Sequence, residues 1–293
     1  MQRRALLSLC TSAPLLMAGC ASSGASAASD ATAATPSSAE LRGTGDLGVV
    51  IERAQGALTL INTSSRSAIG RVTGLGDLSH ASVVFARDGR YAFVFGRDGA
   101  VTRVDLLTQR ITHRVQQAGN SIGGAISADG SLVVAQNYTP GGIKVFDAAT
   151  LELLADVPAL MPSGQRSRVV GLADLPQRRF IYSLFDAGAI CIADCSNPRQ
   201  PRVTTLENIG KQPYDALLSP NGRTYIAGLF GEDGLAMVDM WQEPLQARRI
   251  LGGYGRGEKP LPVYKMPHLR GWAVAGPHAY LPAIGRHEVL VVD

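Results

Sequence analysis

The sequence has few cysteines and few charges, and each scarcity excludes a class of protein. Four cysteines in 293 residues are too few for a fold held together by disulfides, and this composition, 45% hydrophobic and only 18% charged, is not that of a disordered chain. The formal net charge is +4, and the Lys and Arg residues are scattered. The chain therefore lacks the basic stripe that binds a nucleic-acid backbone, and we expect a globular protein without a nucleic-acid partner.

Several catalytic and metal-binding motifs are also missing. There is no H-E-x-x-H, no H-x3-H, no phosphate-binding glycine loop and no C-x-x-C-H for covalent haem attachment. Residues 119–123 match G-x-S-x-G, but no helix pattern follows, so we expect Ser121 to be structural rather than a nucleophile. Cys191 and Cys195 have neither a redox nor a zinc spacing, and we expect them to be buried as small apolar residues.

Glycine is abundant, with 33 residues placed between short runs of Val, Ile and Leu. No helical period is sustained; short apolar strands instead alternate with turns such as Asp88-Gly89 and Asn221-Gly222. Each unit ends on a strand that closes on a polar residue, at intervals of about 40 to 50 residues: Asn62, Asp105, Asp147, Asp194, Asp239 and Asp293. This period predicts an all-β fold of β-propeller type, in which the closing residues form turns rather than act as catalytic acids.

The N-terminal residues predict a targeting signal rather than part of the fold. Residues 1–19 combine a basic start, a short apolar stretch and a small-residue end, which is typical of a signal peptide. They lead into Cys20 through Leu-Met-Ala-Gly, which resembles a bacterial lipobox; the resemblance implies lipidation of Cys20 and anchoring at the periplasmic face of the outer membrane. An ordinary cleaved signal with an incidental Cys20 is the alternative. Residues 22–40 have almost no large apolar side chain, so residues 20–44 predict a flexible tether, and residues 45–293 predict a propeller domain.

One segment of the repeat carries a more specific resemblance. Residues 80–99, HASVVFARDGRYAFVFGRDG, resemble the blade of the cytochrome cd1 nitrite reductase haem d1 domain that supplies the proximal haem ligand. The histidine that matches His80 is the axial iron ligand in that family, and the arginine that matches Arg97 faces the haem carboxylates. Further matches fall on a haem-contacting tyrosine, a conspicuous arginine and a histidine-bearing segment: Tyr138, Arg168 and His268.

The departures from the reductase are equally informative. Its two distal histidines, which protonate nitrite, correspond here to Tyr214 and to a histidine-free stretch near Lys259, and its covalent c-haem domain has no counterpart. The resemblance therefore does not imply nitrite reduction. A lipoprotein signal combined with a haem d1-type propeller and no c-haem most resembles the NirF family, whose members are periplasmic and are required for haem d1 biosynthesis in denitrification.

The resemblance to the NirF family covers residues 45–293 and implies a binding site. It implies that haem d1 or its precursor dihydro-haem d1 binds non-covalently in the propeller channel, with His80 as the axial iron ligand. The residues implied to bind it are His80, Arg97, Tyr138, Arg168, Tyr214 and His268. Further implied partners are other haem d1 maturation proteins, nitrite reductase and, through Cys20, the membrane. The family propeller has eight blades, whereas residues 45–293 provide about six at about 45 residues each, so we expect the last blades to be missing.

The resemblance leaves the mode of action open and names no catalytic residue. One hypothesis is participation in a late step of haem d1 biosynthesis, such as dehydrogenation of a side chain of the macrocycle. A second is a non-catalytic carrier or assembly factor that passes the tetrapyrrole to nitrite reductase. A third is a propeller that only binds proteins, in which the arginines named above would not converge.

Overall fold

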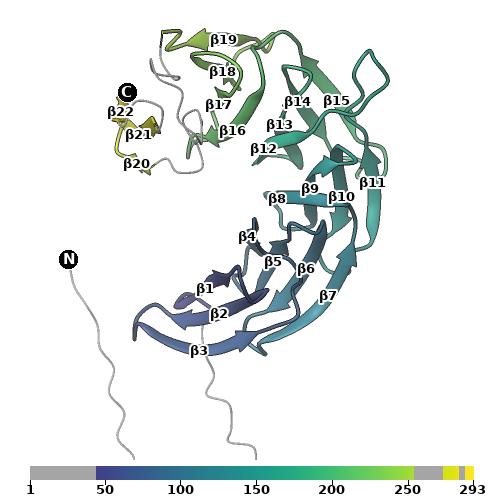
Figure 1. Ribbon diagram of the computed structural model, residues 1–293, viewed down its shortest axis with the longest axis vertical. Coiled ribbons are helices and arrows are strands. Elements are labelled where there is room, and N and C mark those ends of the chain that lie inside the picture. The colour runs from purple at the N-terminus through teal and green to yellow at the C-terminus, as the bar shows by residue number, and fades with distance from the viewer. Residues whose placement is uncertain (1–43, 254–272, 284–287) are drawn as a thin grey trace, which may run out of the picture. The chain divides into compact units, whose positions relative to one another are not determined.

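The structure, a computed structural model, describes residues 44–253, 273–283 and 288–293 (Figure 1). These ranges contain β-strands and no α-helix, and none of their segments is a helix long and apolar enough to cross a membrane. The predictions for residues 1–19, for Cys20 and for His268 concern positions outside the described residues, as does the stretch around Lys259.

The described strands pair into six antiparallel sheets, and each sheet is a meander of consecutive strands. The first sheet contains β1 (Leu47–Glu52), β2 (Ala57–Asn62) and β3 (Ser67–Val72). The second contains β4 (Ser82–Phe85), β5 (Tyr91–Phe95), β6 (Ala100–Asp105) and β7 (Arg110–Gln116). The third contains β8 (Asn120–Ile126), β9 (Leu132–Thr139), β10 (Gly142–Asp147) and β11 (Leu153–Val157).

The remaining three sheets continue the same pattern. The fourth contains β12 (Val169–Leu175), β13 (Arg179–Leu184), β14 (Ala189–Asp194) and β15 (Arg202–Leu206). The fifth contains β16 (Pro213–Leu218), β17 (Thr224–Leu229), β18 (Leu235–Asp239) and β19 (Ala247–Ile250). The sixth contains β20 (Ala273–Ala275), β21 (His278–Ala283) and β22 (Glu288–Val292).

The second to fifth sheets are neighbours through their first strands, because β4 contacts β8, β8 contacts β12, and β12 contacts β16 (Figure 1). A four-stranded sheet cannot bury both of its faces alone, so it packs one face on the preceding sheet and the other on the following one. This arrangement of four-stranded meanders around their first strands confirms the all-β propeller predicted from the sequence, with six sheets in the described residues.

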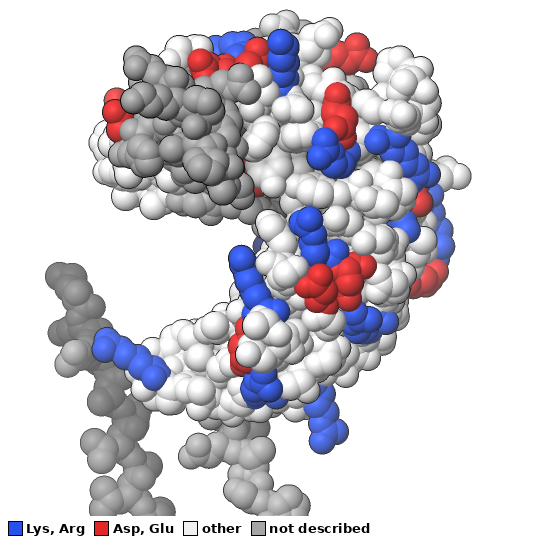
Figure 2. Space-filling model, in the orientation of Figure 1, with Lys and Arg blue, Asp and Glu red and all other residues white. Residues whose placement is uncertain are grey.

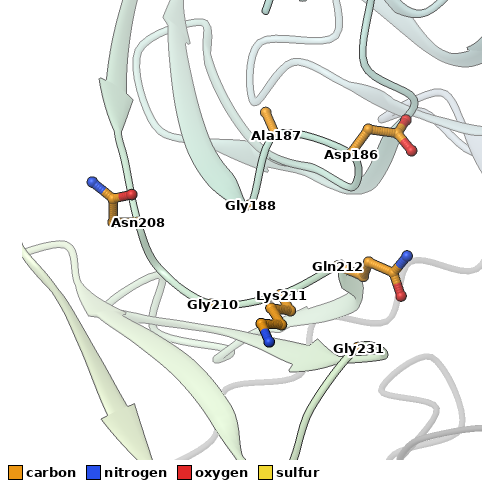
Figure 3. A pocket seen from close by; sticks show the side chains of 8 residues that line it. All are labelled: Asp186, Ala187, Gly188, Asn208, Gly210, Lys211, Gln212 and Gly231. Atoms are coloured by element: carbon orange, nitrogen blue, oxygen red, sulfur yellow. The ribbon is translucent and has the colours of Figure 1, made fainter.

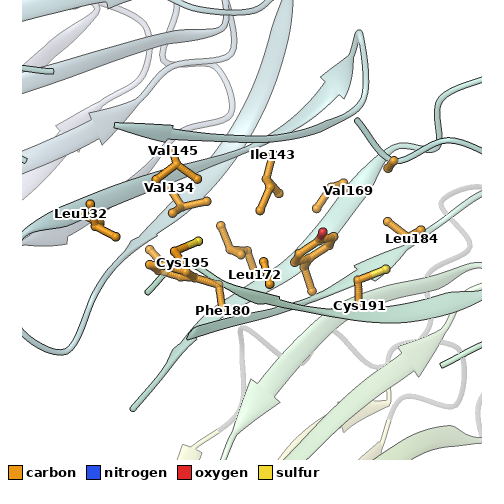
Figure 4. Packing of buried hydrophobic residues seen from close by; sticks show 14 of the residues in the cluster. Leu132, Val134, Ile143, Val145, Val169, Leu172, Phe180, Leu184, Cys191 and Cys195 are labelled. Atoms are coloured by element: carbon orange, nitrogen blue, oxygen red, sulfur yellow. The ribbon is translucent and has the colours of Figure 1, made fainter. Parts of the chain in front are cut away.

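The hydrophobic core lies between consecutive sheets rather than at one centre. Between the third and fourth sheets, Val134 and Ile143 pack against Phe180 and Tyr182 (Figure 4). Separate clusters fill the spaces between the second and third sheets and between the fourth and fifth. Alternating Val, Ile, Leu and Phe side chains supply both faces of each sheet, which is why the strands are nearly continuous apolar runs in the sequence.

Two cysteines belong to the core between the third and fourth sheets. Cys191 and Cys195 are buried, as predicted, and no disulfide joins them (Figure 4). Burial raises the pKa of the Cys195 thiol to about 12, and it also raises the pKa of Cys191. Neither thiol is a reactive nucleophile near neutral pH, because the thiolate is the reactive form.

Five of the six closing polar residues, all but Asp293, form turns as predicted. Asp105 Oδ1 accepts hydrogen bonds from the Leu107 and Thr108 amides at 3.0 and 3.2 Å, and Asp147 Oδ1 accepts from two amides in the same way. Equivalent bonds are made at the ends of β2, β14 and β18, by Asn62, Asp194 and Asp239. These side chains are therefore occupied in satisfying turn amides, which removes them as candidate catalytic acids.

Two buried polar contacts supplement the backbone pairing, one within the third sheet and one between the third and fourth sheets. Ser121 is fully buried in β8 and donates its Oγ hydrogen to the Gln136 carbonyl oxygen at 2.7 Å, so it is structural, as predicted. Gln136 Oε1 in turn accepts a 3.0 Å hydrogen bond from the amide of Leu172 in β12, where the register of β12 on β13 is irregular. The Gln136 side chain thus satisfies an amide that the β12 irregularity would otherwise leave unpaired.

Candidate functional site

The residues singled out in the sequence lie at one end of the sheets, which we call the strand-start rim. It consists of the positions where β4, β8, β12 and β16 begin, together with the turns that follow β5, β9, β13 and β17. Antiparallel pairing brings these positions together, because the start of each first strand faces the end of the second, as in Ser82 with Phe95 and Val169 with Leu184. The rim contains His80, Arg97, Tyr138, Arg168 and Tyr214.

His80 and Arg97 are joined through one turn of the second sheet. His80 is exposed in the turn before β4. In that turn, Asp77 Oδ1 accepts a 2.8 Å hydrogen bond from the Ser79 amide, and the Asp77 carbonyl accepts a 2.8 Å bond from the Arg97 amide. The bonds from Ser79, with a smaller effect of the Arg97 charge, lower the pKa of Asp77. The turn that carries His80 is therefore fixed to the turn that carries Arg97.

Two tyrosine hydroxyls meet at this rim. The Tyr138 hydroxyl, at the end of β9, donates a 3.0 Å hydrogen bond to the Tyr214 hydroxyl in β16. The Arg97 guanidinium carbon lies 5.9 Å from the centroid of the Tyr138 ring, within the range of a cation–π contact. Burial, assisted by the bond to Tyr214, raises the pKa of Tyr138 far above its usual value. Tyr138 is therefore a neutral hydroxyl at any physiological pH.

Two phenylalanines complete the rim and were not recognised in the sequence. Phe185 and Tyr214 have centroids 5.8 Å apart in an edge-on arrangement, and Phe230 lies 6.1 Å from Phe185 and 5.8 Å from Tyr214. Each phenylalanine directly follows the second strand of its sheet, β13 or β17. Arg97 and Tyr138 occupy equivalent turn regions of earlier sheets, so aligning the repeats on their second strands could have found Phe185 and Phe230.

Arg168 is held beside this aromatic group by a charged partner. Its Nε donates to Asp186 Oδ2 at 3.1 Å and its Nη2 to Asp186 Oδ1 at 2.5 Å, and its guanidinium carbon lies 4.2 Å from the Phe185 centroid. Burial alone would raise the pKa of Asp186, but the Arg168 guanidinium and amide outweigh it, so the pKa is lowered. Arg168 also acts electrostatically on Tyr138 and Tyr214, which places its charge near the hydroxyl pair.

A cavity of about 610 Å³ opens beside the same rim (Figure 3). One wall is the turn after β13, and the other is the segment before β16 together with the turn after β17. It is lined by Asp186, Ala187, Gly188, Asn208, Gly210, Lys211, Gln212 and Gly231. Its volume is within the range of small-molecule sites. Because Asp186 both lines the cavity and binds Arg168, the cavity and the aromatic cluster are contiguous.

The rim therefore combines an imidazole, guanidinium groups, aromatic rings and neutral hydroxyls. Among the described residues, no group of three His, Cys, Asp or Glu side chains could form a metal centre. This donor set suits a planar anionic ligand that carries a metal ion already bound by the ligand's own atoms. A histidine could occupy a remaining coordination position of that metal, and arginines could bind the ligand's carboxylates. Over the described part of the face shown in Figure 2, basic and acidic side chains are interspersed.

Comparisons with known proteins agree on one family. Residues 42–293 match the family model described as the cytochrome D1 heme domain. The chain is 63% identical over 255 residues to Protein NirF of Stutzerimonas stutzeri and 60% identical to Protein NirF of Pseudomonas aeruginosa. Each of these alignments covers 86% of this chain and 65% of the relative. The chain therefore spans slightly less than two thirds of the length of these curated relatives.

The fold is also similar to a solved structure. That structure is described as the dihydro-heme d1 dehydrogenase NirN in complex with DHE, and it superposes with a TM-score of 0.70 at 25% sequence identity. The similarity covers 89% of this chain and 54% of that one.

Proposed function

The chain belongs to the cytochrome D1 heme domain family and, within it, to the NirF family, and on that premise we propose that it binds haem d1 or a close precursor at the strand-start rim. His80 would be the axial ligand of the iron, and Arg97 and Arg168 would bind carboxylates. The solved neighbour described as a complex with DHE supports a tetrapyrrole as the ligand. We propose that binding is non-covalent; the sequence contains no C-x-x-C-H, the motif that attaches haem covalently.

The observation that supports this proposal most is the convergence of residues from separate sheets. Arg97 contacts the ring of Tyr138, Tyr138 bonds to Tyr214, and Arg168 acts on both tyrosines. A propeller used only for protein contacts gives no reason for these two arginines to approach one hydroxyl pair. Their convergence favours a common anionic ligand, since charge-assisted hydrogen bonds from arginine contribute about 1.5 to 3 kcal/mol each.

Each part of the rim has a distinct task in binding the tetrapyrrole. The iron and the conjugated ring supply the electron chemistry of the bound group. Phe185 and Phe230 provide an apolar surface that excludes water from the ring, and Asp186 fixes the direction of the Arg168 guanidinium. The neutral Tyr138 hydroxyl donates to Tyr214 and would add no charge to the binding site.

We further propose that the chain acts in a late step of haem d1 biosynthesis, of which dehydrogenation of a side chain is one form. A carrier role is the second candidate, and one observation favours it. Within the cluster, the shifted pKa values of Tyr138 and Asp186 keep each of these two groups in one protonation state near neutral pH. Neither is therefore a proton donor or acceptor matched to that pH.

We also propose a site of action from the N-terminal sequence. Residues 1–19 would direct export, and lipidation of Cys20 would attach the protein to the outer membrane on its periplasmic side. Two or three acyl chains give lasting attachment, whereas a single chain gives only marginal binding. The partners would be other haem d1 maturation proteins and nitrite reductase.

Incubation with dihydro-haem d1 and an electron acceptor tests both candidates. Binding is followed by the Soret absorption of the full chain, and conversion is followed by the mass and spectrum of the extracted pigment. A shifted Soret band with altered pigment supports the biosynthetic step, and a shifted band with unchanged pigment supports the carrier. An unchanged spectrum contradicts both.

A further inference from the structure

The cavity beside the rim is a groove built on close contacts between loops. Gly188, Gly210 and Gly231 line it, and a Cβ added to Gly188 would lie 2.7 Å from the Gly210 carbonyl oxygen. A Cβ added to Gly231 would lie 2.8 Å from the Lys211 Cβ. Glycine at these positions lets the walls approach, and it leaves Asn208, Lys211 and Gln212 as the longer side chains beside Asp186 (Figure 3).

The two acidic side chains at the groove are already neutralised. Asp186 binds Arg168 through two nitrogens. Glu232 accepts a 2.6 Å bond from the Lys211 amide and a 2.8 Å bond from Arg249 Nη1, and its pKa is lowered, chiefly by the Lys211 amide. The exposed Lys211 ammonium is a further cation at the groove, and its charge makes a smaller contribution to lowering the pKa of Glu232.

The groove is tied to the aromatic cluster through the backbone. The Phe230 amide donates a 2.8 Å hydrogen bond to the Gln212 carbonyl, and the Gly231 amide donates a 3.1 Å bond to the Lys211 carbonyl. Phe230 packs on Phe185 and Tyr214, so the segment that carries Lys211 borders the aromatic surface directly. A ligand resting on the rings could therefore extend a side arm into the groove.

We propose that this groove binds a carboxylate arm of the tetrapyrrole, with the Lys211 ammonium as its cation and the Asn208 and Gln212 amides as further donors. The inference rests on the proposed function and adds to it a second carboxylate-binding subsite, across the aromatic cluster from Arg97. Net positive charge, amide donors and contact with the ring-binding surface are the features that a flexible carboxylate arm requires. The groove thus selects macrocycles with acidic substituents on more than one edge.

The test compares Lys211→Gln with wild type and with Arg202→Gln, which removes an exposed cation from the outer strand β15. Each full chain is titrated with haem d1, with iron protoporphyrin IX, which carries two propionates, and with its dimethyl ester, which carries no carboxylate charge. We expect Lys211→Gln to weaken binding of haem d1 by about five-fold or more, Lys211→Arg to restore most of it, and Arg202→Gln to stay within two-fold of wild type. The Lys211→Gln deficit should disappear with the ester.

The outcomes separate this inference from the proposed function. If wild type binds haem d1 and Lys211→Gln binds within two-fold of it, the groove takes no carboxylate and the inference is wrong, while the proposed function stands. If the deficit persists with the dimethyl ester, the charge does not act on a macrocycle carboxylate, and the inference is again wrong. If wild type leaves the haem d1 spectrum unchanged, the proposed function itself fails, and the inference fails with it.

Discussion

The Tyr138 and Tyr214 hydroxyls form a 3.0 Å hydrogen bond although their sheets are not neighbours in the propeller. Tyr138 belongs to the third sheet and Tyr214 to the fifth, and the fourth sheet lies between them in the order of the propeller. The two side chains meet beyond the start of β12, where the first strands of successive sheets contact one another. The bond joins the third and fifth sheets, and the separate ring contact between Phe185 and Tyr214 adds the fourth sheet to the same cluster.

A double-mutant cycle measures that connection. Replacement of Tyr138 by Phe or of Tyr214 by Phe should each lower the free energy of unfolding by about 0.5 to 1.5 kcal/mol, the usual net value of a hydrogen bond. The double variant should lose less than the sum of the two, because both single changes remove the same bond. Urea unfolding gives all four values, and strict additivity would contradict the bond.

The pH dependence of stability reports on Tyr138 separately. Its pKa in the folded protein is raised above that of the unfolded chain, which is about 10. The neutral hydroxyl therefore contributes stability that is complete below pH 10 and is lost as the pH rises toward the folded pKa. Wild type should lose stability more steeply than Tyr138→Phe above about pH 10, as measured by urea unfolding at each pH. Parallel curves would show that Tyr138 titrates normally.

The fold was largely predictable from the sequence because its signals are local. A turn such as Asp88-Gly89 and a closing residue such as Asp105 act on their own backbone, so they recur visibly in each repeat. The pairing of Tyr138 with Tyr214 was not predictable in this way, since it depends on how the sheets rotate about their first strands. Phe185 and Phe230 were missed because, taken singly, they are indistinguishable from core aromatics.

Close packing of the first strands makes Gly171 a sensitive position. Its φ is +64°, and an added Cβ would lie 2.8 Å from the Ala216 Cβ and 3.0 Å from the Tyr214 carbonyl oxygen. We expect Gly171→Ala to lower the free energy of unfolding by about 2 to 4 kcal/mol, through backbone strain and overpacking together. Gly222→Ala is the matched control, because its φ is +70° and nothing lies within 4 Å of the added Cβ. The control should cost about 1 kcal/mol, and equal losses would contradict the packing argument.

The ion pair of Arg168 with Asp186 predicts an effect of acid. The pKa of Asp186 is lowered in the folded protein, so its contribution is present above the unfolded pKa of about 3.9 and is lost as the pH falls through the folded value. Because the two side chains are 43% and 29% exposed, we expect at most about 1 kcal/mol. Between pH 7 and pH 3, wild type should lose more stability than Asp186→Asn. An identical loss in both proteins would show that the pair contributes nothing.

The most direct test of the account is the haem d1 titration of wild type, His80→Ala and His113→Ala, followed by Soret absorption. His113 is an exposed histidine of the outer strand β7 and is the matched control. The account predicts a saturable band shift for wild type and His113→Ala. For His80→Ala it predicts loss of that shift in a protein that still unfolds cooperatively in urea. A His80→Ala spectrum identical to that of wild type, or no shift in wild type, would contradict the assignment of His80 as the iron ligand.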